Sequence, residues 1–390
     1  MKTIIHVLYF LLISTATAFG QIEAVWMTHK THTPDKIVIS WLSNKPGNSI
    51  VRYGSSTDYD HKVAVNENVR LHHVEIPISE KDVIYHYSVM TGSQKSPDKS
   101  FKGYPSDTLR IAISADFLHQ HSITPILKDK IHLFVTAGDH IRWGLHSFCE
   151  PEEGSNIIHS CDDAFANFVD YASDILSVTP FMPSLGNHDR QIRPRTDTCS
   201  LTNTMAYDTT AAAYRRFFEL PGREWLWYFD IPEFGVRFIT VDDAHYVNQG
   251  DILHASHSLA ADAEQTIWFD SVMSQSKDIP FVIVLHNTVN VLLRQADHGN
   301  WQKRLERCTI TVSGYGYYAE REIYNEETYY NVSSVGNGPY YGDLHEGYRG
   351  NEDNYLLLTF IKSTGIMKAQ LKSLEKPGTL LDGTQVFHGL

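Results

Sequence analysis

The segment Phe181–Asp189, which reads FMPSLGNHD, decides the fold because it joins an apolar, strand-like run to a cluster of polar side chains. The same order occurs in three other places: IAISAD at Ile111–Asp116, LFVTAGDH at Leu133–His140 and FVIVLH at Phe281–His286. Short, continuously apolar runs are typical of strands that are buried on both faces. Because open α/β folds collect their ligand groups at the carboxyl ends of parallel strands, these four segments predict one shared site.

The polar residues that end these runs include Asp116, Asp139, Asn187 and His286. A single Asp or Asn after a strand is usually a turn residue. Four such residues in this order predict a set of metal ligands, since carboxylate, amide oxygen and imidazole together suit a divalent ion of intermediate hardness.

Residues 107–390 alternate strand-like and helix-like segments, which is typical of an α/β domain with buried sheets. The expected strands are Leu109–Ser114, Ile131–Thr136, Pro180–Ser184, Val236–Val241, Pro280–Leu285, Thr309–Val312 and Tyr355–Ile361. The expected helices are Asp162–Leu176, Ala211–Leu220 and Ala263–Ser274.

Residues 21–106 show a different pattern, with short alternating runs and no helical stretch. The segment Asn44–Asn48, which reads NKPGN, predicts a turn. Strands at this spacing favour a small β-sandwich, in which Trp41 would be a core residue. The expected strands are Ile22–Met27, Ile37–Leu42, Ser49–Tyr53, His72–Ile78, Val83–Met90 and Ser100–Tyr104.

The segment Gly314–Arg321, which reads GYGYYAER, completes a pattern that resembles the calcineurin-like metallophosphoesterases and, among them, the purple acid phosphatases. The family pattern is D…GDxxY…GNH(D/E)…VxxH…GHxHxYER, and Asp116, Asp139, residues 186–189 and His286 match its first four parts. The resemblance implies an N-terminal fibronectin type III-like β-sandwich, followed by a four-layered α/β/β/α domain with a two-metal centre.

Three positions depart from the family pattern. Tyr315 and Tyr317 stand in place of the GHxH histidines, and Arg142 stands in place of the tyrosine of GDxxY. By the resemblance, one metal site keeps three of its four ligands and the other keeps two. Since a two-metal clamp holds both the attacking and the leaving oxygen, we expect a remodelled centre that binds one divalent ion (Zn, Fe or Mn) rather than two.

The catalytic candidates are His188, Arg142, Tyr315 and Tyr317. In the family, the histidine of GNH lies beside the substrate and orients or protonates the leaving group, and imidazole suits acid–base chemistry near neutral pH. A structural, hydrogen-bonded role is the alternative for His188.

The candidates for substrate binding are Arg190, Arg193 and His245. The two arginines belong to a basic stretch directly after the GNHD segment, and such a stretch attracts anionic groups. A solvated loop is the alternative. His245 follows Asp242 and Asp243 at the end of a strand, where it could also replace a missing metal ligand.

Three functions are compatible with these residues. The first is a metal-dependent hydrolase of phosphate or sulfate esters. The second is a lyase or dehydratase that acts on acidic, uronate-containing oligosaccharides, with Tyr and His as the acid–base groups. The third is an inactive binding protein whose tyrosines fill the emptied pocket.

The composition restricts the location and the partners. The formal net charge of −13 over 390 residues argues against nucleic acid as a partner. Residues 1–20 place an apolar run after Lys2 and end in small residues, as a signal peptide does, and no other stretch predicts a membrane span. We therefore expect a secreted or periplasmic protein with an anionic small molecule or oligosaccharide as its substrate.

An oxidising compartment also allows the four cysteines to form disulfides. We expect Cys149 to pair with Cys161, which lies close to it in sequence, and Cys199 to pair with Cys308.

Overall fold

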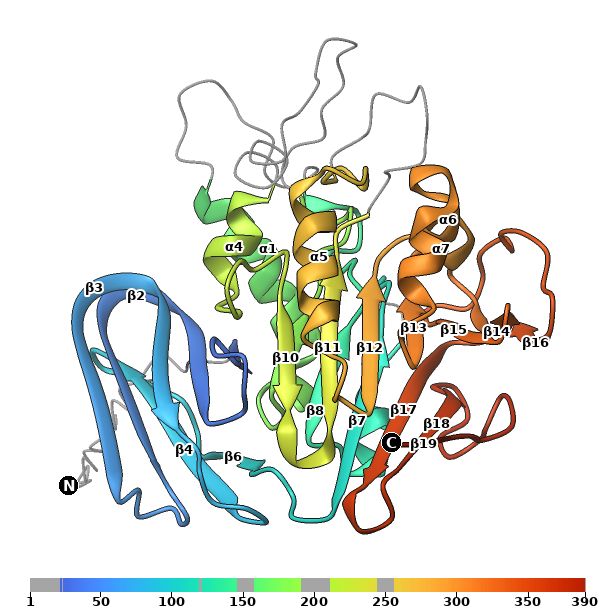
Figure 1. The fold of residues 1–390 in the computed structure, drawn as a ribbon. Coiled ribbons are helices and arrows are strands. Elements are labelled where there is room, and N and C mark those ends of the chain that lie inside the picture. The colour runs from blue at the N-terminus through green and yellow to red at the C-terminus, as the bar shows by residue number, and fades with distance from the viewer. Residues whose placement is uncertain are drawn as a thin grey trace, which may run out of the picture.

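The computed structural model describes residues 22, 24–118, 121–145, 158–190, 211–243 and 256–389 (Figure 1). The predicted signal peptide lies outside these residues, as do Arg193, His245, Cys149 and Cys199. Within the described ranges, no helix is both long enough and apolar enough to cross a membrane. Strands form the first part of the chain, and strands alternate with helices in the rest.

The first six strands belong to one hydrogen-bonded sheet. They are β1 (Val25–Thr28), β2 (Lys36–Gly54), β3 (His61–Pro77), β4 (Ile84–Thr91), β5 (Gln94–Lys95) and β6 (Lys99–Lys102). β2 is central, since it pairs with β1, β3 and β4. Trp41 of β2 is fully buried, donates from Nε1 to Thr91 Oγ1 at 2.8 Å and stacks on His72, which confirms it as a core residue. A fibronectin type III-like sandwich is not confirmed, because all six strands share one bonded network.

The predicted turn at Asn44–Asn48 is wrong. β2 continues through these residues, and its pairing with β3 shifts register between Leu42 and Gly47 and again between Gly47 and Ser49. A bulge takes up extra residues without ending a strand, and it bends that strand. Two predicted strands are therefore the two ends of one strand of 19 residues.

Two further sheets form the rest of the described chain, and all seven strands predicted after residue 107 have counterparts in them. The six-stranded sheet has the order β19-β18-β17-β7-β8-β9, and the seven-stranded sheet has the order β10-β11-β12-β13-β15-β14-β16. β7, β8 and β9 run parallel, and so do β11, β12 and β13. This arrangement confirms the mixed α/β fold.

The strands of the six-stranded sheet are β7 (Thr108–Ser114), β8 (Leu133–Thr136), β9 (Phe181–Pro183), β17 (Asn354–Ile361), β18 (Ile366–Ser373) and β19 (Gln385–His388). Those of the seven-stranded sheet are β10 (Tyr228–Ile231), β11 (Val236–Val241), β12 (Phe281–His286), β13 (Ile310–Ser313), β14 (Ala319–Tyr324), β15 (Glu327–Asn331) and β16 (Gly347–Gly350).

Helices cover the outer faces of these sheets. The α-helices are α1 (Ile158–Tyr171), α2 (Ser173–Leu176), α4 (Ala212–Phe217), α5 (Glu264–Ser274), α6 (Asn290–Gln295) and α7 (Asn300–Leu305), and the short 3₁₀ helices are η1 (Thr124–Asp129), η3 (Pro232–Phe234), η4 (Asp297–Gly299) and η5 (Lys362–Thr364). Val282 and Val284 of β12 pack among residues of α5, α6 and α7, whereas Phe281 and Ile283 join the core that includes the six-stranded sheet. β12 is therefore buried on both faces, which explains its continuously apolar sequence.

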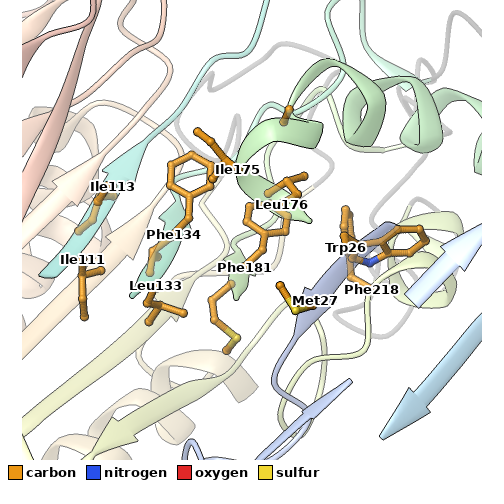
Figure 2. Close-up of a cluster of buried hydrophobic side chains, with 14 of the residues drawn as sticks. Trp26, Met27, Ile111, Ile113, Leu133, Phe134, Ile175, Leu176, Phe181 and Phe218 are labelled. Carbon is orange, nitrogen blue, oxygen red and sulfur yellow. The ribbon is translucent and has the colours of Figure 1, made fainter. Parts of the chain in front are cut away.

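The N-terminal sheet packs directly against the α/β part. Figure 2 shows Trp26 and Met27 of β1 beside Phe218, in the same apolar cluster as strands β7–β9. The ring of Trp26 also stacks on Phe217, with 4.3 Å between the centroids. Because apolar contacts run without a break from one part to the other, the first sheet stabilises the helices that flank the α/β core.

One predicted disulfide is wrong. Cys308 is a free, buried thiol that packs in the apolar cluster beneath α5–α7, and burial raises its pKa. The predicted bridge between Cys199 and Cys308 therefore does not form. The bridge between Cys149 and Cys161 stays a prediction, because Cys149 lies outside the described residues.

Candidate metal centre

The predicted site residues lie at the carboxyl ends of strands from both sheets. Asp116 follows β7, Asp139 follows β8, Asn187 follows β9, Tyr315 follows β13, and His286 ends β12. Since β7–β9 and β11–β13 are parallel sets, each set presents its strand ends along one edge of its sheet.

Asp116 and Asp139 form a pair of buried carboxyl groups, 0% and 2% exposed. Their turns are joined, because the N–H of Phe117 donates to the carbonyl oxygen of Asp139 at 2.8 Å. Burial, and then the charge of Asp139, raises the pKa of Asp116 well above its ordinary value. Burial likewise raises the pKa of Asp139, with His188 opposing the shift and Asp189 adding to it. Two like charges in a buried site cost free energy, which a bound cation would remove.

One oxygen of this pair lacks a protein partner. Oδ1 of Asp116 accepts the N–H of Tyr315 at 2.8 Å. Oδ2 of Asp116 is buried, and none of the described residues offers it a hydrogen bond. Buried carboxylate oxygens are normally bonded to donors or to metal ions, so this oxygen marks a place for positive charge.

Gly138 and Gly186 allow the turns after β8 and β9 to touch. A Cβ atom added to Gly186 would lie 2.2 Å from the amide nitrogen of Asp139, and one added to Gly138 would lie 2.7 Å from the Cα atom of Gly186. Gly138 also has a φ of +87°, in the left-handed region that favours glycine. The spacing between Asp139 and Asn187 is therefore set by backbone packed against backbone.

Four non-glycine residues of the site share this left-handed conformation. Asp116, Asp139, Tyr315 and Tyr317 have φ angles of 56°, 61°, 67° and 54°. Each costs roughly 1–2 kcal/mol relative to the right-handed region, and such strain collects at functional sites.

His188 is fixed beside the carboxylate pair. Its backbone N–H donates to Oδ1 of Asp139 at 2.9 Å, and its ring Nδ1 donates to the carbonyl oxygen of Ile141 at 2.9 Å. Its own carbonyl oxygen accepts the N–H of Leu145 at 2.6 Å. Because Nδ1 carries the donated proton, Nε2 is the nitrogen that can exchange a proton with a bound molecule.

His286 is held in a way that the sequence did not predict. The ring is fully buried, with Nδ1 at 2.7 Å from Oδ2 of Asp243 and Nε2 at 3.0 Å from Oδ1 of Asn290. The amide of Asn290 is oriented by its Nδ2, which donates to the carbonyl oxygen of Tyr330 at 2.9 Å. Asp243 and Asn290 therefore hold the ring from both sides.

The next residue, Asn287, contacts the turns after β8 and β9. Its Nδ2 donates to the carbonyl oxygen of Ala137 at 3.1 Å, and its Oδ1 accepts the N–H of Asn187 at 3.3 Å. Sequence reasoning missed Asn287, Asp243 and Asn290. The available signals were the two carboxylates after β11 and the closeness in sequence of Asn290 to His286.

The two tyrosines lie beside the carboxylate pair. Burial, followed by the charges of Asp116 and Asp139, raises the pKa of Tyr317, so its hydroxyl stays protonated. The ring of Tyr315 lies 6.2 Å from that of Tyr341. The structure thus brings Tyr315 and Tyr317 to the same place as Asp116, Asp139 and His188.

Arg190 lies in the interior. It is 0% exposed, and its Nη2 donates to Oδ1 and Oδ2 of Asp242 at 2.6 and 2.7 Å. Oδ2 of Asp242 also lies 2.6 Å from Nδ1 of His257. Burial alone would raise the pKa of Asp242, but Arg190 and His257 lower it to about 2. This environment favours a structural role for Arg190 over contact with a substrate.

Arg142 is less buried than Arg190. Arg142 is partly exposed, with its guanidinium carbon 4.6 Å from the centre of the Trp143 ring. Arg193 and His245 lie outside the described residues, so their roles in substrate binding stay predictions.

Asp116, Asp139 and Asn187 fit one divalent ion. Two carboxylates and an amide supply the oxygen ligands that such ions accept, and the unpartnered Oδ2 of Asp116 marks where positive charge belongs. Across the described ranges, no group of three His, Cys, Asp or Glu side chains could hold a metal ion.

Known proteins share this architecture. Residues 110–327 match the family described as calcineurin-like phosphoesterase. In structure the chain is similar to the purple acid phosphatase PPD1 of yellow lupin (Lupinus luteus), with 14% identity, a TM-score of 0.67, and 94% of this chain and 74% of that chain covered. It is also similar to PhoD, with 11% identity, a TM-score of 0.68, and 95% and 91% of the two chains covered. At these identities, the likeness in structure shows a shared fold and no more. No curated protein matches the chain in sequence.

Proposed function

The chain belongs to the calcineurin-like phosphoesterase family, and on that premise we propose that it is a metal-dependent hydrolase of phosphate or sulfate esters with a remodelled, one-metal centre. The observation that carries the proposal is the buried pair of Asp116 and Asp139 with one unpartnered carboxylate oxygen. We also propose that the protein is exported, because residues 1–20 have the layout of a signal peptide.

Asp116, Asp139 and Asn187 are the residues that would hold the ion. When bound, a divalent ion acts as a Lewis acid that polarises a phosphoryl or sulfuryl oxygen. The protein must supply the remaining electrostatic support, because Tyr315 and Tyr317 occupy the positions of the family's last two histidines.

His188 and Tyr317 are suited to that task. The Nδ1 donation of His188 to Ile141 fixes the ring so that Nε2 can pass a proton to a leaving alkoxide. The raised pKa of Tyr317 keeps its hydroxyl as a donor, which can stabilise charge that develops on a substrate oxygen.

A second candidate is a lyase or dehydratase that acts on uronate-containing oligosaccharides. The phenol groups of Tyr315 and Tyr317 favour this candidate, because an elimination needs an acid and a base beside the sugar. Because burial keeps the hydroxyl of Tyr317 protonated, this residue could only be the acid of an elimination. His188 would then be the base.

Metal content and product chemistry test the proposal together. Purified protein is analysed for metal per chain and assayed with p-nitrophenyl phosphate, p-nitrophenyl sulfate and uronate oligosaccharides. We expect about one ion per chain and ester hydrolysis. Asp116→Asn should lose the ion and about 10²-fold or more of the turnover.

The matched control is Asp163→Asn, which makes the same chemical change at an exposed side chain and should alter neither quantity. Formation of an unsaturated sugar without ester hydrolysis would favour the elimination. If the protein holds no ion and turns over none of the substrates, the result would favour the third function, an inactive binding protein.

A further inference from the structure

A groove lies at the amino ends of β12 and β13, at the opposite end of these strands from the metal centre. It has a volume of about 590 Å³, which is in the range of ligand-binding clefts. Its walls come from the end of α5, the segments that lead into β12 and β13, and β19. Since β12 has six residues, about 20 Å of strand separates the groove from the site at its carboxyl end.

β19 is the outermost strand of the six-stranded sheet, and its free edge borders the groove. It pairs only with β18. Three consecutive residues of β19, Val386, Phe387 and His388, line the groove, whereas none of the described residues of β18 does so. Because consecutive side chains of a strand point to opposite faces, a groove that all three residues line runs along the outer edge of the strand.

The backbone groups of this edge are open. The N–H of Gly389 donates to the carbonyl oxygen of Gly365 at 2.8 Å, so these two residues form a hydrogen-bonded pair of the ladder. Such pairs alternate with non-bonded pairs between antiparallel strands, and the N–H and C=O groups of Val386 and His388 therefore point away from β18. Within the described part of the chain, no hydrogen bond reaches these groups. A strand edge of this kind can pair with a further strand.

The side chains of the groove are basic, although the chain as a whole is acidic. Lys277, Arg307 and His388 line the groove, and none of its described lining residues is acidic. The formal net charge of the chain is −13. Nη2 of Arg307 donates to the carbonyl oxygen of Met273 at 2.7 Å, which fixes the guanidinium beside the groove. Among the described residues, none of the three basic side chains forms an ion pair. A ligand with carboxylates would supply the missing counter-charge.

We propose that this groove binds an extended, acidic segment of a partner protein, which adds as a strand to the free edge of β19. The open backbone groups of Val386 and His388 would form the main-chain hydrogen bonds of this pairing. Lys277 and Arg307 would meet the carboxylates of the segment. The side chain of Val386 is 48% exposed and offers an apolar contact beside the edge. The proposal does not depend on phosphoesterase activity, since none of these residues belongs to the metal centre.

Fluorescence anisotropy on the full chain tests the proposal, with a labelled hexapeptide of alternating glutamate and valine as the probe. We expect this peptide to bind. The same peptide with lysine in place of glutamate should bind about tenfold more weakly, because like charges then meet in the groove. Methylation of alternate peptide nitrogens removes main-chain donors of the added strand, and it should also weaken binding by about tenfold.

Two variants change the protein side of the contact. Lys277→Gln combined with Arg307→Gln removes two cations and should weaken binding by about fivefold. Val386→Pro removes an N–H of the outer edge, where proline is tolerated, and should weaken binding by about tenfold. The matched control is Lys62→Gln, which makes the same chemical change at an exposed side chain of the N-terminal sheet. It should bind the peptide as wild type does.

The double glutamine variant keeps the result interpretable if Val386→Pro disturbs β19. The proposal is overturned if the acidic peptide does not bind, if the methylated peptide binds as tightly as the unmethylated one, or if the double glutamine variant binds as wild type does. Displacement of the peptide by an equal concentration of inorganic phosphate would also overturn it, since the groove would then be a site for small anions.

Discussion

Replacing Arg190 by Met removes one partner of a buried ion pair and leaves Asp242 without its guanidinium partner. Both side chains are almost fully buried, at 1% and 0% exposure. Breaking such a pair costs about 3–5 kcal/mol in the free energy of unfolding, since Asp242 then keeps only His257 as a charged partner in the interior. For a chain of this size, that loss corresponds to a fall of about 4–6 °C in the melting temperature.

Urea unfolding and calorimetry at neutral pH measure the loss. The double change Arg190→Met with Asp242→Asn should recover much of it, because no uncompensated charge then remains. Lys36→Met is the matched control. It breaks the exposed pair of Lys36 and Glu75 and should leave the stability almost unchanged. Wild-type stability of Arg190→Met, together with weaker substrate binding, would refute the structural role. It would restore Arg190 as a substrate-binding residue.

Three further predictions concern other parts of the chain. Burial lowers the pKa of His29 to about 4. The contribution of His29 to stability is therefore complete above about pH 6.5 and is lost as the pH falls toward 4. In urea unfolding at pH 6.5 and pH 4, His29→Gln should reduce this acid-induced loss of stability by about 3 kcal/mol. Tyr315→His combined with Tyr317→His should raise the metal content by at least one ion per chain, and an unchanged metal content by mass spectrometry would mean that the pocket has diverged beyond these ligands. Cys308 should react with a thiol reagent only after unfolding, so rapid labelling of the native protein at this position would contradict its burial.

The strands of the α/β part could be predicted because buried parallel strands are apolar at every position, and runs such as Phe281–His286 carry that signature. The N-terminal sheet was harder to predict. Pro46 and Gly47 are turn residues by preference, yet pairing with β3 carries the strand through them with a bulge. That outcome depends on a partner strand elsewhere in the chain, which local preference does not contain.

The same limit applies to the site. Sequence could place His286 at the end of β12, because the apolar run stops there. It could not give the direction of the ring, which is set by Asp243, 43 residues earlier in the chain, and by Asn290 in the following helix. Asp116 and Asp139 were easier to place, since a short turn after a strand leaves a side chain few directions to point.

The contact between Gly138 and Gly186 bears on how such a site can change during evolution. Because backbone packs on backbone there, the contact between the two turns does not depend on the side chains that the turns carry. Side chains on these turns can therefore be exchanged one at a time, histidine for tyrosine or tyrosine for arginine, without the chain having to refold. Proteins with this contact can therefore change the chemistry of the site while the backbone stays the same. Gly138 and Gly186 are the two positions that must stay glycine, because a Cβ atom at either would clash with the other turn.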